Sequence, residues 1–413
     1  MAKLKLAHGN WVKGDRFWGR KKDLELFTQR IEEGAHILLT AQRRMGKTSL
    51  MREAERVLAG SYVCLFVDLQ KARSAADAVV EIALALKPYD KLWRKAKKVF
   101  GNVIQKAIAK IEKASIRELS ITLRSGLTRG DWAEKGSDLF SVLATFSQPV
   151  VLFIDELPIM INRMLKGDEF VITPERRQNA DEFLSWLRHN SIQHKGQIRI
   201  VVSGSIGLEP ILHQAGLSAS ITTFAPFELK PWDEPTAVGC LQALANEYGV
   251  CLAGEAAAAM VNRLGCCIPH HVQMFFAGVR DRCVRAGRME FSADDVEDVY
   301  NNHMLSTRGH AELTHYEERL AMVLGKERFW LALDMLTEAA VTGCLTPEAL
   351  AAIRQDHGSE DIELAQRDIL SVLEHDGYLQ PAHGGYAFVS SLVRDWWTKR
   401  YKLLYTPVMK RRR

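Results

Sequence analysis

The sequence lacks a long uninterrupted apolar run, and this absence bears on where the protein works. The opening residues, MAKLKLAHGNWVKGDRF, reach Lys13, Asp15 and Arg16 without the apolar core of a secretory signal, so none is expected there. The longest uncharged stretch, residues 210–227, carries Ser, Thr, Gln, His and Gly and is unsuited to hydrocarbon. We therefore expect a cytoplasmic protein without membrane contact.

The sequence lacks the cysteine patterns that are typical of metal binding or redox chemistry. None of the seven cysteines belongs to a CxxC pair. They are Cys64, Cys240, Cys251, Cys266, Cys267, Cys283 and Cys344. Most lie in apolar surroundings, which favours reduced, buried thiols over disulfides or metal ligands. His270 and His271 follow two of them, but the remaining ligand pattern of a zinc site is missing.

The bulk composition is that of an ordinary globular chain. With 413 residues, of which 47% are hydrophobic and 25% charged, the chain is long enough for two or three domains. No internal repeat or low-complexity segment is evident. A net charge of +5 permits a nucleic-acid partner without requiring one.

Five apolar runs predict β-strands in the first part of the chain. They are residues 36–40, 62–69, 150–156, 198–205 and 221–229. Because the runs are almost continuously apolar and their connections can hold helices, they favour a parallel sheet covered on both faces. The predicted fold class is α/β, with a doubly wound layout.

Helical periodicity replaces the strand pattern after residue 230. We expect an α/β domain over residues 1–230, a helical domain over 231–306, a further domain over 307–406 and a basic tail over 407–413. In the third domain, helices precede the run DGYLQPAHGGYAFVS, whose two β-type runs flank a five-residue Pro-Ala-His-Gly-Gly turn. Helices followed by such a hairpin are typical of a winged helix.

A basic segment interrupts the α/β domain at about residues 88–130. Between Lys87 and Arg129, twelve Lys or Arg stand against three acids. Apolar residues recur there at helical spacing, at Leu92, Val99, Val103, Ile104, Ile108 and Ile111. The pattern predicts an inserted amphipathic helix. Its basic face is either a solvated cap on the sheet edge or a contact for nucleic-acid phosphates or a protein partner.

The stretch TAQRRMGKTSL follows the first predicted strand and opens a helical pattern. Its GKT tripeptide is weak evidence alone, since a helix start can spell it by chance. Strand, loop and helix in that order are what a phosphate-binding P-loop needs. Gly46 would allow close backbone approach, Lys47 would reach the β- and γ-phosphates, and Thr48 would bind Mg²⁺. The expected nucleotide-binding residues are Ala41, Gln42, Arg43, Arg44, Met45, Gly46, Lys47, Thr48 and Ser49.

Polar residues end two other predicted strands. VVLFIDE closes with two carboxylates, which a purely structural buried strand has little reason to carry. Asp155 is expected to hold Mg²⁺ opposite Thr48, and Glu156 to polarise the attacking water. The catalytic assignments are Glu156, Lys47 and Asp155. Ser203 and Ser205, in IRIVVSGS, would lie near the γ-phosphate if their strand sits between the other two; the alternative is a serine that caps a turn.

A resemblance to a known family covers nearly the whole chain. FWGRKKDLELF, TAQRRMGKTSL, VVLFIDELP, IRIVVSGS, LGCCIPHHVQMFF and DGYLQPAHGGYAFVSSLVRDWW resemble, in order, the archaeal ATPase branch of the prokaryotic STAND and AAA+ P-loop ATPases. The resemblance implies an AAA+-type P-loop core, a helical lid over 231–306 and a C-terminal winged-helix domain over 307–406. It also implies ATP or ADP as ligand and Mg²⁺ as cofactor.

The same resemblance assigns roles to residues outside the central motifs. Arg20 matches an entry motif beside the nucleotide, although a surface arginine in a turn is the alternative. Pro269 matches a lid proline near the base, although a proline at the first helical position explains it as well. Arg43 and Arg44 match paired loop arginines that anchor neighbouring acids or phosphates.

One expected residue is missing. In AAA+ proteins a catalytic arginine is often found between the sensor strand and the fifth strand, yet none occurs between Arg199 and Arg263. Because such an arginine can contribute about 10³-fold or more in rate, hydrolysis by the isolated chain should be slow. The candidates to replace it are Arg163, Arg176, Arg177 and Arg188.

Three functional interpretations remain. The preferred one is an ATP-binding, slowly hydrolysing STAND/AAA+-type regulatory switch that acts through protein partners or self-assembly. The second is an ATP-dependent DNA-binding initiator or loader, or a transposition- or defence-associated ATPase, with nucleic acid held by the basic segment 87–129. The third is a nucleotide-bound scaffold with little hydrolysis. The helix expected before the hairpin, residues 360–376, has six acids and one arginine and would repel phosphates.

Overall fold

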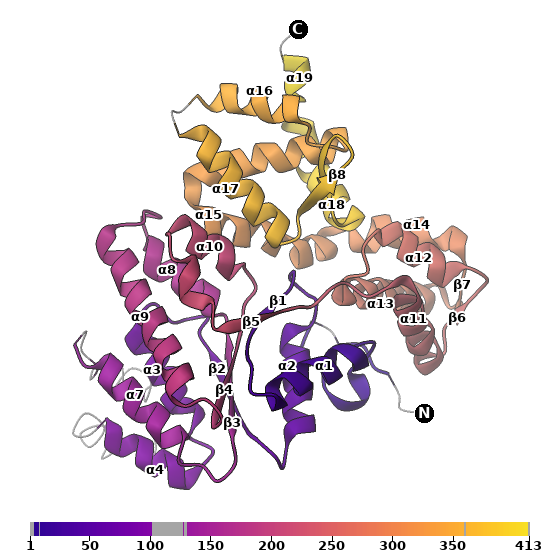
Figure 1. Cartoon of the computed structure of the whole chain (residues 1–413). Coiled ribbons are helices and arrows are strands. Elements are labelled where there is room, and N and C mark those ends of the chain that lie inside the picture. The colour runs from indigo at the N-terminus through magenta and orange to yellow at the C-terminus, as the bar shows by residue number, and fades with distance from the viewer. Residues whose placement is uncertain (1–3, 8, 101–126, 128–129, 359–360, 412–413) are drawn as a thin grey trace. The chain divides into compact units, whose positions relative to one another are not determined.

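The computed structural model describes residues 4–7, 9–100, 127, 130–358 and 361–411 (Figure 1). The chain divides into two compact units. The sheet unit comprises Lys22–Thr40 and Glu53–Glu228, and the helical unit comprises Met1–Lys21, Ala41–Arg52 and Leu229–Arg413. The loop predicted to bind phosphates therefore belongs to the helical unit, although it follows a strand of the sheet unit in the chain.

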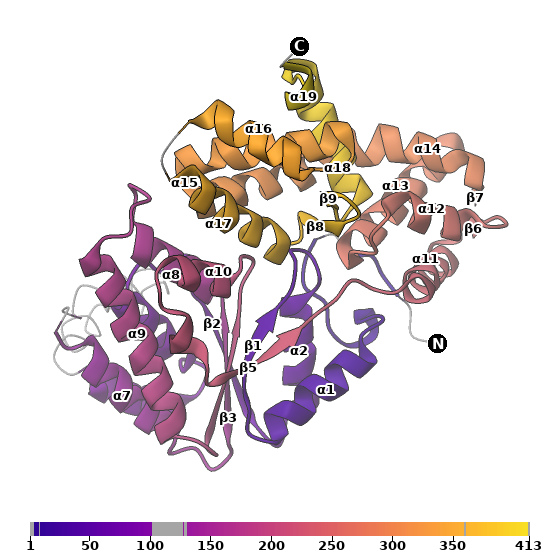
Figure 2. The same cartoon turned by 45° about the horizontal axis from the view of Figure 1, so that its top comes forward.

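Five parallel strands form the core of the sheet unit, in the order β2-β3-β4-β1-β5 (Figure 2). They are β1 His36–Thr40, β2 Val63–Asp68, β3 Val150–Asp155, β4 Ile198–Ser203 and β5 Phe224–Glu228. Each strand falls within one of the five predicted runs, so the α/β parallel sheet is confirmed. β4 is buried along its whole length and β3 is buried up to its last residue. The strand that carries Ser203 lies between β1 and β3, as its predicted role requires.

Helices lie on both sides of this sheet, with α1 on one side and α7, α8 and α9 on the other (Figure 2). The helices are α1 Lys21–Glu32, α3 Ala75–Ala85, α4 Asp90–Val99, α7 Trp132–Leu143, α8 Leu157–Lys166, α9 Pro174–Gln193 and α10 Leu208–Gln214. Local sequence fixes several starts. The Ser74 and Thr173 side chains each accept a backbone N–H at the beginning of α3 and α9, and Pro174 occupies the first turn of α9.

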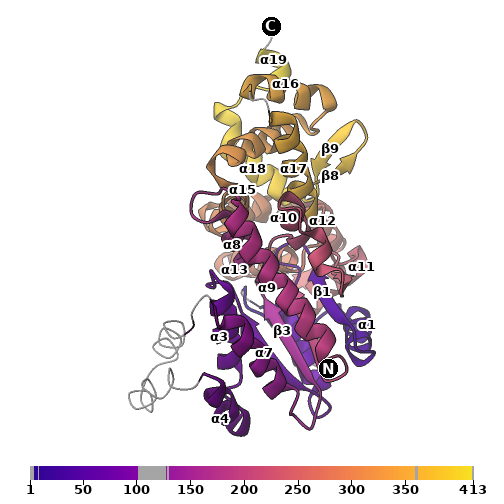
Figure 3. The same ribbon diagram turned by 60° about the vertical axis from the view of Figure 1, so that its left-hand side comes forward.

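The described part of the basic segment includes helix α4, which packs beside α7 (Figure 3). Leu92 and Ala96 are buried against the unit. The exposed face carries cations at Lys91, Arg94, Lys95 and Lys98. α4 lies within the segment for which an amphipathic helix was predicted, and the inserted helix of about residues 88–130 stays a prediction. Its further apolar positions, Val103, Ile104, Ile108 and Ile111, lie outside the described residues.

The described part of the helical unit beyond residue 229 is built mainly of helices. The longer ones are α11 Glu234–Tyr248, α12 Ala256–Leu264, α13 Pro269–Ala286, α15 Thr307–Thr342, α16 Pro347–His357, α17 Ile362–His375 and α18 Ser391–Tyr401. α14 Val296–Val299 and α19 Val408–Arg411 are short. Gly325 has non-helical backbone angles and kinks α15. Two short parallel strands, β6 Cys251–Leu252 and β7 Glu290–Phe291, were not predicted.

A β-hairpin follows α17, as the sequence predicted. β8 Leu379–Ala382 and β9 Gly385–Phe388 pair antiparallel, with Ala382 opposite Gly385. The turn is therefore the two residues His383 and Gly384, tighter than the five-residue turn read from the sequence. The element order, helices then hairpin, is the one expected for a winged helix, and the winged-helix assignment stays a prediction.

The seven cysteines are free thiols. Cys240, Cys266, Cys267 and Cys283 are buried, as expected, and burial raises the pKa of the Cys240 thiol to about 12. Cys251 is exposed, which corrects the expectation for that residue, because the short strand β6 lies at the surface. In the part of the chain that is described, no helix is both long and apolar enough to cross a bilayer.

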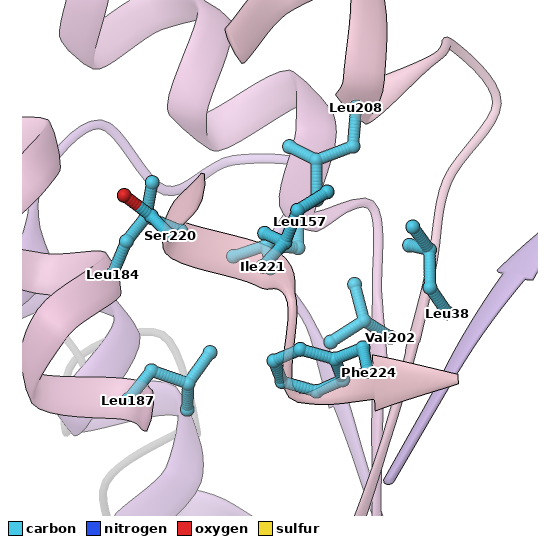
Figure 4. Close-up of a pocket in the computed structure, with 9 residues that line it drawn as sticks. All are labelled: Leu38, Leu157, Leu184, Leu187, Val202, Leu208, Ser220, Ile221 and Phe224. Carbon is cyan, nitrogen blue, oxygen red and sulfur yellow. The ribbon is translucent and has the colours of Figure 1, made fainter. Parts of the chain in front are cut away.

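A small cavity lies between the sheet and the helices that cover it (Figure 4). Its lining comes from β1, β4 and β5 on one side and from α8, α9 and α10 with the short turn Ser218–Ile221 on the other. All the lining residues except Ser220 are apolar: Leu38, Leu157, Leu184, Leu187, Val202, Leu208, Ile221 and Phe224. This lining offers no charged group to a phosphate.

A pair of glycine substitutions tests the helix packing. A Cβ at Gly136 of α7 would lie 2.5 Å from the Trp186 ring, whereas at Gly239 of α11 the nearest atom is 3.4 Å away. Alanine normally stabilises a helix by about 0.5–1 kcal/mol relative to glycine. We expect Gly136→Ala to lower the free energy of unfolding by about 1–3 kcal/mol in urea, because of overpacking. Gly239→Ala should leave it unchanged or raise it, and equal gains for both variants would contradict the packing.

Candidate functional site

The loop between β1 and α2 curls around a lysine side chain. α2 spans Lys47–Leu58. The Lys47 ammonium is buried and donates to the Ala41 carbonyl at 2.8 Å and to the Gln42 carbonyl at 3.2 Å. Gly46 has φ of +93°, a conformation that side chains rarely adopt. The predicted role of this loop as a phosphate cradle stays a prediction.

Two further contacts fix this loop within the helical unit. The Arg20 guanidinium is 5% exposed and donates to the Met45 carbonyl at 3.1 Å and to the Lys230 carbonyl at 2.9 Å. The Ser49 hydroxyl accepts the Val12 N–H at 3.1 Å. The alternative of a surface arginine at residue 20 is wrong, because its side chain is buried in the support of the loop. Its contact with a nucleotide stays a prediction.

The loop arginines contact helix α15. The Arg44 guanidinium, on a residue with φ of +68°, donates to a Glu312 carboxylate oxygen at 3.2 Å and to the His315 ring at 3.3 Å. It also donates to the Gly9 carbonyl at 3.4 Å, and Arg43 donates to the His315 carbonyl at 3.4 Å. The sequence predicted that these arginines anchor neighbouring acids or phosphates. It missed Glu312 and His315, because they are some 270 residues away along the chain.

Glu312 supplies the negative charge that pairs with Arg44. A hydrogen bond from His270, at 3.2 Å, and the nearby Arg44 lower the pKa of Glu312 to about 2, so this residue is a carboxylate at neutral pH. Burial lowers the pKa of Arg43 to about 10, which still leaves it charged. Burial, with help from the two arginines, lowers the pKa of His315 to about 2.

His271 belongs to the same cluster and is held neutral. Its side chain is 1% exposed, and its ring lies 6.3 Å from the ring of Tyr316. Burial, then the neighbours His270 and Arg44, lowers the pKa of His271 to about 3. Among the described residues, neither ring nitrogen has a hydrogen-bond partner. An imidazolium at this position would be both desolvated and repelled by Arg44.

In the sheet unit, the acid pair predicted at the end of β3 is held by two serines, one that ends β4 and one that follows it. The Ser203 hydroxyl donates to Asp155 Oδ1 at 2.6 Å, and the Glu156 N–H donates to the same oxygen at 3.1 Å. Ser205 donates to Glu156 Oε2 from both its backbone N–H and its hydroxyl, each at 2.9 Å. The structure therefore brings Ser203 to Asp155, and it adds Ser205 as a partner of Glu156.

The sheet order brings the relevant strand ends to one edge. β4 pairs in parallel with β1 on one side and with β3 on the other. Thr40, Asp155 and Ser203 therefore end neighbouring strands at the same edge of the sheet, where ligands bind in open parallel sheets. The phosphate-loop segment starts at the next residue after Thr40, which is Ala41.

Other predicted residues have structural roles that the sequence left open. Pro269 is buried and begins α13, which supports the helix-start explanation; contact with a base stays a prediction. Three of the four arginines offered as substitutes for the missing one hold backbone carbonyls of the sheet unit. Arg163 bonds Gln70 and Ala72, Arg176 bonds Lys166 and Val171, and Arg177 bonds Ala215 and Gly216. Arg188 is exposed on α9.

The chain shares its fold with a known ATPase. It is similar to a Walker-type ATPase of Pyrococcus abyssi, at 16% identity and a TM-score of 0.59, over 94% of this chain and 97% of the other. The two chains share an overall fold, which in this chain has a five-stranded parallel sheet at its core. At this identity the likeness shows the fold and not the activity. No protein-family model matches the chain, and no curated protein matches it.

Two weaker similarities carry no argument, because their TM-scores are below 0.5. One is to the Aeropyrum pernix ORC1 protein in complex with DNA, at 12% identity and a TM-score of 0.44, over 97% of this chain and 96% of that one. The other is to the RuvB Holliday junction branch migration motor of Thermotoga maritima, at 14% identity and a TM-score of 0.43, over 94% and 96%.

The neutral His271 predicts how stability depends on pH. Below its ordinary pKa of 6.5 the unfolded chain binds a proton that the folded chain excludes down to about pH 3. The free energy of unfolding should therefore fall as pH falls, by up to about 1.4 kcal/mol per pH unit from this residue. Urea unfolding at pH 7.5 and 5.0 should show His271→Leu losing about 2 kcal/mol less than the wild type over this range.

A matched change at the exposed His383 serves as the control for this measurement. His383→Leu should keep the wild-type dependence on pH. If the free energy of unfolding depends on pH identically in His271→Leu and the wild type, burial of neutral His271 is not the cause of the pH dependence.

Proposed function

We propose that the chain binds ATP with Mg²⁺, hydrolyses it slowly and acts as a nucleotide-dependent switch through protein partners or self-assembly. The observation that carries the proposal is the Asp155–Glu156 pair at the edge of a parallel sheet whose β1 strand leads directly into the lysine-centred loop. Acids and a lysine loop after neighbouring strands of one sheet are the combination that phosphoryl chemistry requires. This proposal includes ADP as the second ligand of the switch.

The loop fits a phosphate group. Lys47 is already directed at the inside of its own loop, where its ammonium holds two carbonyls. Phosphate oxygens would compete for the same ammonium donors. The N-terminus of α2 adds backbone N–H groups and a favourable dipole for an anion, because its first residues are the end of the same loop. The segment Ala41–Ser49 is therefore proposed as the phosphate-binding element.

Two oxygen donors are proposed for Mg²⁺. Thr48, in the first turn of α2, offers a hydroxyl, and Asp155 offers a carboxylate that Ser203 orients. Such oxygen ligands suit Mg²⁺, which binds one or two protein groups together with substrate phosphates. When bound, the ion would neutralise charge on the phosphates. Among the described residues, no group of three or more His, Cys, Asp or Glu could hold a metal by itself, so the phosphates would be needed to complete the coordination.

Glu156 is proposed to orient the attacking water and to receive its proton. Its carboxylate is held in place by Ser205, and it follows directly on the proposed Mg²⁺ ligand Asp155. Three substitute arginines are engaged in holding loops, which supports slow turnover in the isolated chain. A neighbouring molecule that supplies a cation would accelerate the reaction. This requirement favours a switch or an assembly over a free-running motor.

The contact between the loop and α15 supports the role of a switch. Arg43 and Arg44 are part of the proposed phosphate-binding element, and both bond to His315, with Glu312 as the counter-charge for Arg44. Any change of loop conformation on nucleotide binding would alter these bonds. Because α15 leads into the rest of the C-terminal helices, the proposed readout of the switch is the segment 307–406, which we assign as a winged helix that binds protein.

A nucleic-acid partner remains a second candidate because of one observation. The exposed cations of α4 lie at Lys91, Arg94, Lys95 and Lys98, which share one helix face. Against DNA recognition by the C-terminal region stands the acidity of α17, where Glu363 and Asp368 pair with arginines of the same region. If nucleic acid binds, the α4 face is the proposed contact, and binding would weaken steeply with salt.

The first test concerns Glu156. We expect Glu156→Gln to lower kcat for ATP at least about a hundredfold, because the amide cannot take the proton from water. ATP affinity should stay within a few-fold of the wild type. The measurement combines steady-state phosphate release with titration of a fluorescent ATP analogue. Glu182→Gln, at an exposed position of α9, is the matched control and should behave as wild type. Unchanged turnover in Glu156→Gln would remove the catalytic assignment.

The second test concerns the loop contact with α15. In the wild type, ATP should change amide hydrogen exchange of the segment 311–320. Glu312→Gln removes the charge that pairs with Arg44, so we expect faster exchange in this segment and a response to ATP reduced at least about twofold. Glu317→Gln, on the same helix but paired with Arg400, is the control and should keep the wild-type response. An unaltered response in Glu312→Gln would show that this contact does not transmit the nucleotide state.

A further inference from the structure

The carboxylate of Glu156 is held by Ser205, which the sequence indicated only as a residue near the γ-phosphate. Two donors of Ser205, its N–H and its hydroxyl, converge on the single oxygen Oε2 at 2.9 Å each. The neighbouring acid is held in the same manner, by Ser203 on Asp155. Two serines that are separated by one glycine at the end of β4 thus bond to two adjacent acids at the end of β3. This correspondence arises because β3 and β4 are adjacent parallel strands.

Helix capping does not explain the direction of the Glu156 side chain. Glu156 is the N-cap residue of α8, yet its side chain makes no capping hydrogen bond to that helix. Its backbone is also in the left-handed region, with φ of +60° and ψ of +26°, where residues other than glycine are strained. The Glu156 side chain thus leaves its own helix uncapped and bonds to Ser205 after β4. This arrangement fixes the position of its carboxylate.

The position of Ser205 is itself fixed by packing. Gly204 precedes it, and a Cβ at Gly204 would lie 2.5 Å from the Pro158 ring in the first turn of α8. The backbone after β4 therefore lies directly against the helix that Glu156 begins. Because the N–H donor of Ser205 belongs to this packed backbone, the hydrogen bonds to Glu156 are anchored to a rigid element.

We infer that Ser205 is a positioning residue for Glu156, which fixes the carboxylate so that it meets the attacking water in one orientation. The inference rests on the proposed function, in which Glu156 orients that water. A glutamate side chain has three rotatable bonds, and two donors on one oxygen remove most of that freedom. Water activation requires the base to be held within about 0.5 Å and 10–20° of its productive geometry. Ser205 acts through Glu156 and has no role of its own toward the nucleotide.

The kinetic test compares Ser205→Ala with two partner variants. Ser205→Ala loses the hydroxyl donor and keeps the N–H, so kcat for ATP should fall about tenfold, the effect of one hydrogen bond to a charged group. The dissociation constant for a fluorescent ATP analogue should stay within about twofold of the wild type. Ser205→Thr retains a hydroxyl and should restore most of kcat. Ser191→Ala removes another serine hydroxyl, one bonded to Arg188 within α9, and should leave kcat unchanged.

A double-mutant cycle separates positioning from a general structural effect. If Ser205 acts only through Glu156, Ser205→Ala should cause no further loss when Glu156 is already glutamine. An equal tenfold loss in both backgrounds would overturn the inference. So would a kcat of Ser205→Ala equal to that of the wild type, or a loss that appears only as weaker ATP binding.

A measurement without nucleotide checks the contact itself. Glu156→Ala removes the acceptor of the Ser205 N–H, so amide hydrogen exchange in residues 204–206 should become at least about tenfold faster than in the wild type. The control Glu182→Ala, at an exposed position, should leave this exchange unaltered. Unchanged exchange in Glu156→Ala would overturn the inference even if the protein hydrolyses ATP. Failure of the proposed function gives a different pattern, in which Glu156→Gln does not lower turnover while the exchange result still holds.

Discussion

The parallel pairing of β1, β4 and β3 is the constraint on which the candidate site depends. Parallel strands place all their carboxyl ends at one edge, so the residues that follow three separate strands are gathered there without any contact between their segments in the sequence. The strand order also decides which side chains come into contact. Because β4 is the direct neighbour of β3, its exit serines reach Asp155 and Glu156. With another strand in that position, the two acids would have different partners.

A second polar cluster surrounds the lysine loop, and burial and charge pairing determine its protonation states. Two arginines are held in partly buried surroundings, and the structure accommodates them with one ionised carboxylate, Glu312, and with histidines kept neutral. The pKa of His271 is lowered most by burial, so its neutrality is a property of packing that the nearby cations reinforce. In the loop that we propose for phosphate binding, Arg44 is therefore already paired with a carboxylate of α15, and a bound phosphate would compete with Glu312 for this arginine.

Much of the fold could be predicted from the sequence. Continuous apolar runs bounded by polar residues predicted all five strands of the main sheet. The helical spacing of apolar residues in the basic segment predicted a helix where α4 lies. The short strands β6 and β7 were missed, because two residues carry no periodicity. The turn of the hairpin is two residues, since Pro381 and Ala382 pair within β8 in spite of their turn-like character. At the candidate site, the sequence indicated Lys47, Asp155 and Glu156 but not the partners of their side chains.

What the sequence by itself determined is the local chemistry: which strands exist, which of them end in acids or hydroxyls, and which loop carries the glycine and lysine. These features depend on residues close together in the chain. Only the tertiary structure decided that Ser205 holds Glu156, that Glu312 and His315 meet Arg44, and that Arg20 is buried under the loop. Such contacts depend on strand order and helix packing, which arise from the summed burial of many side chains, and no short pattern records them.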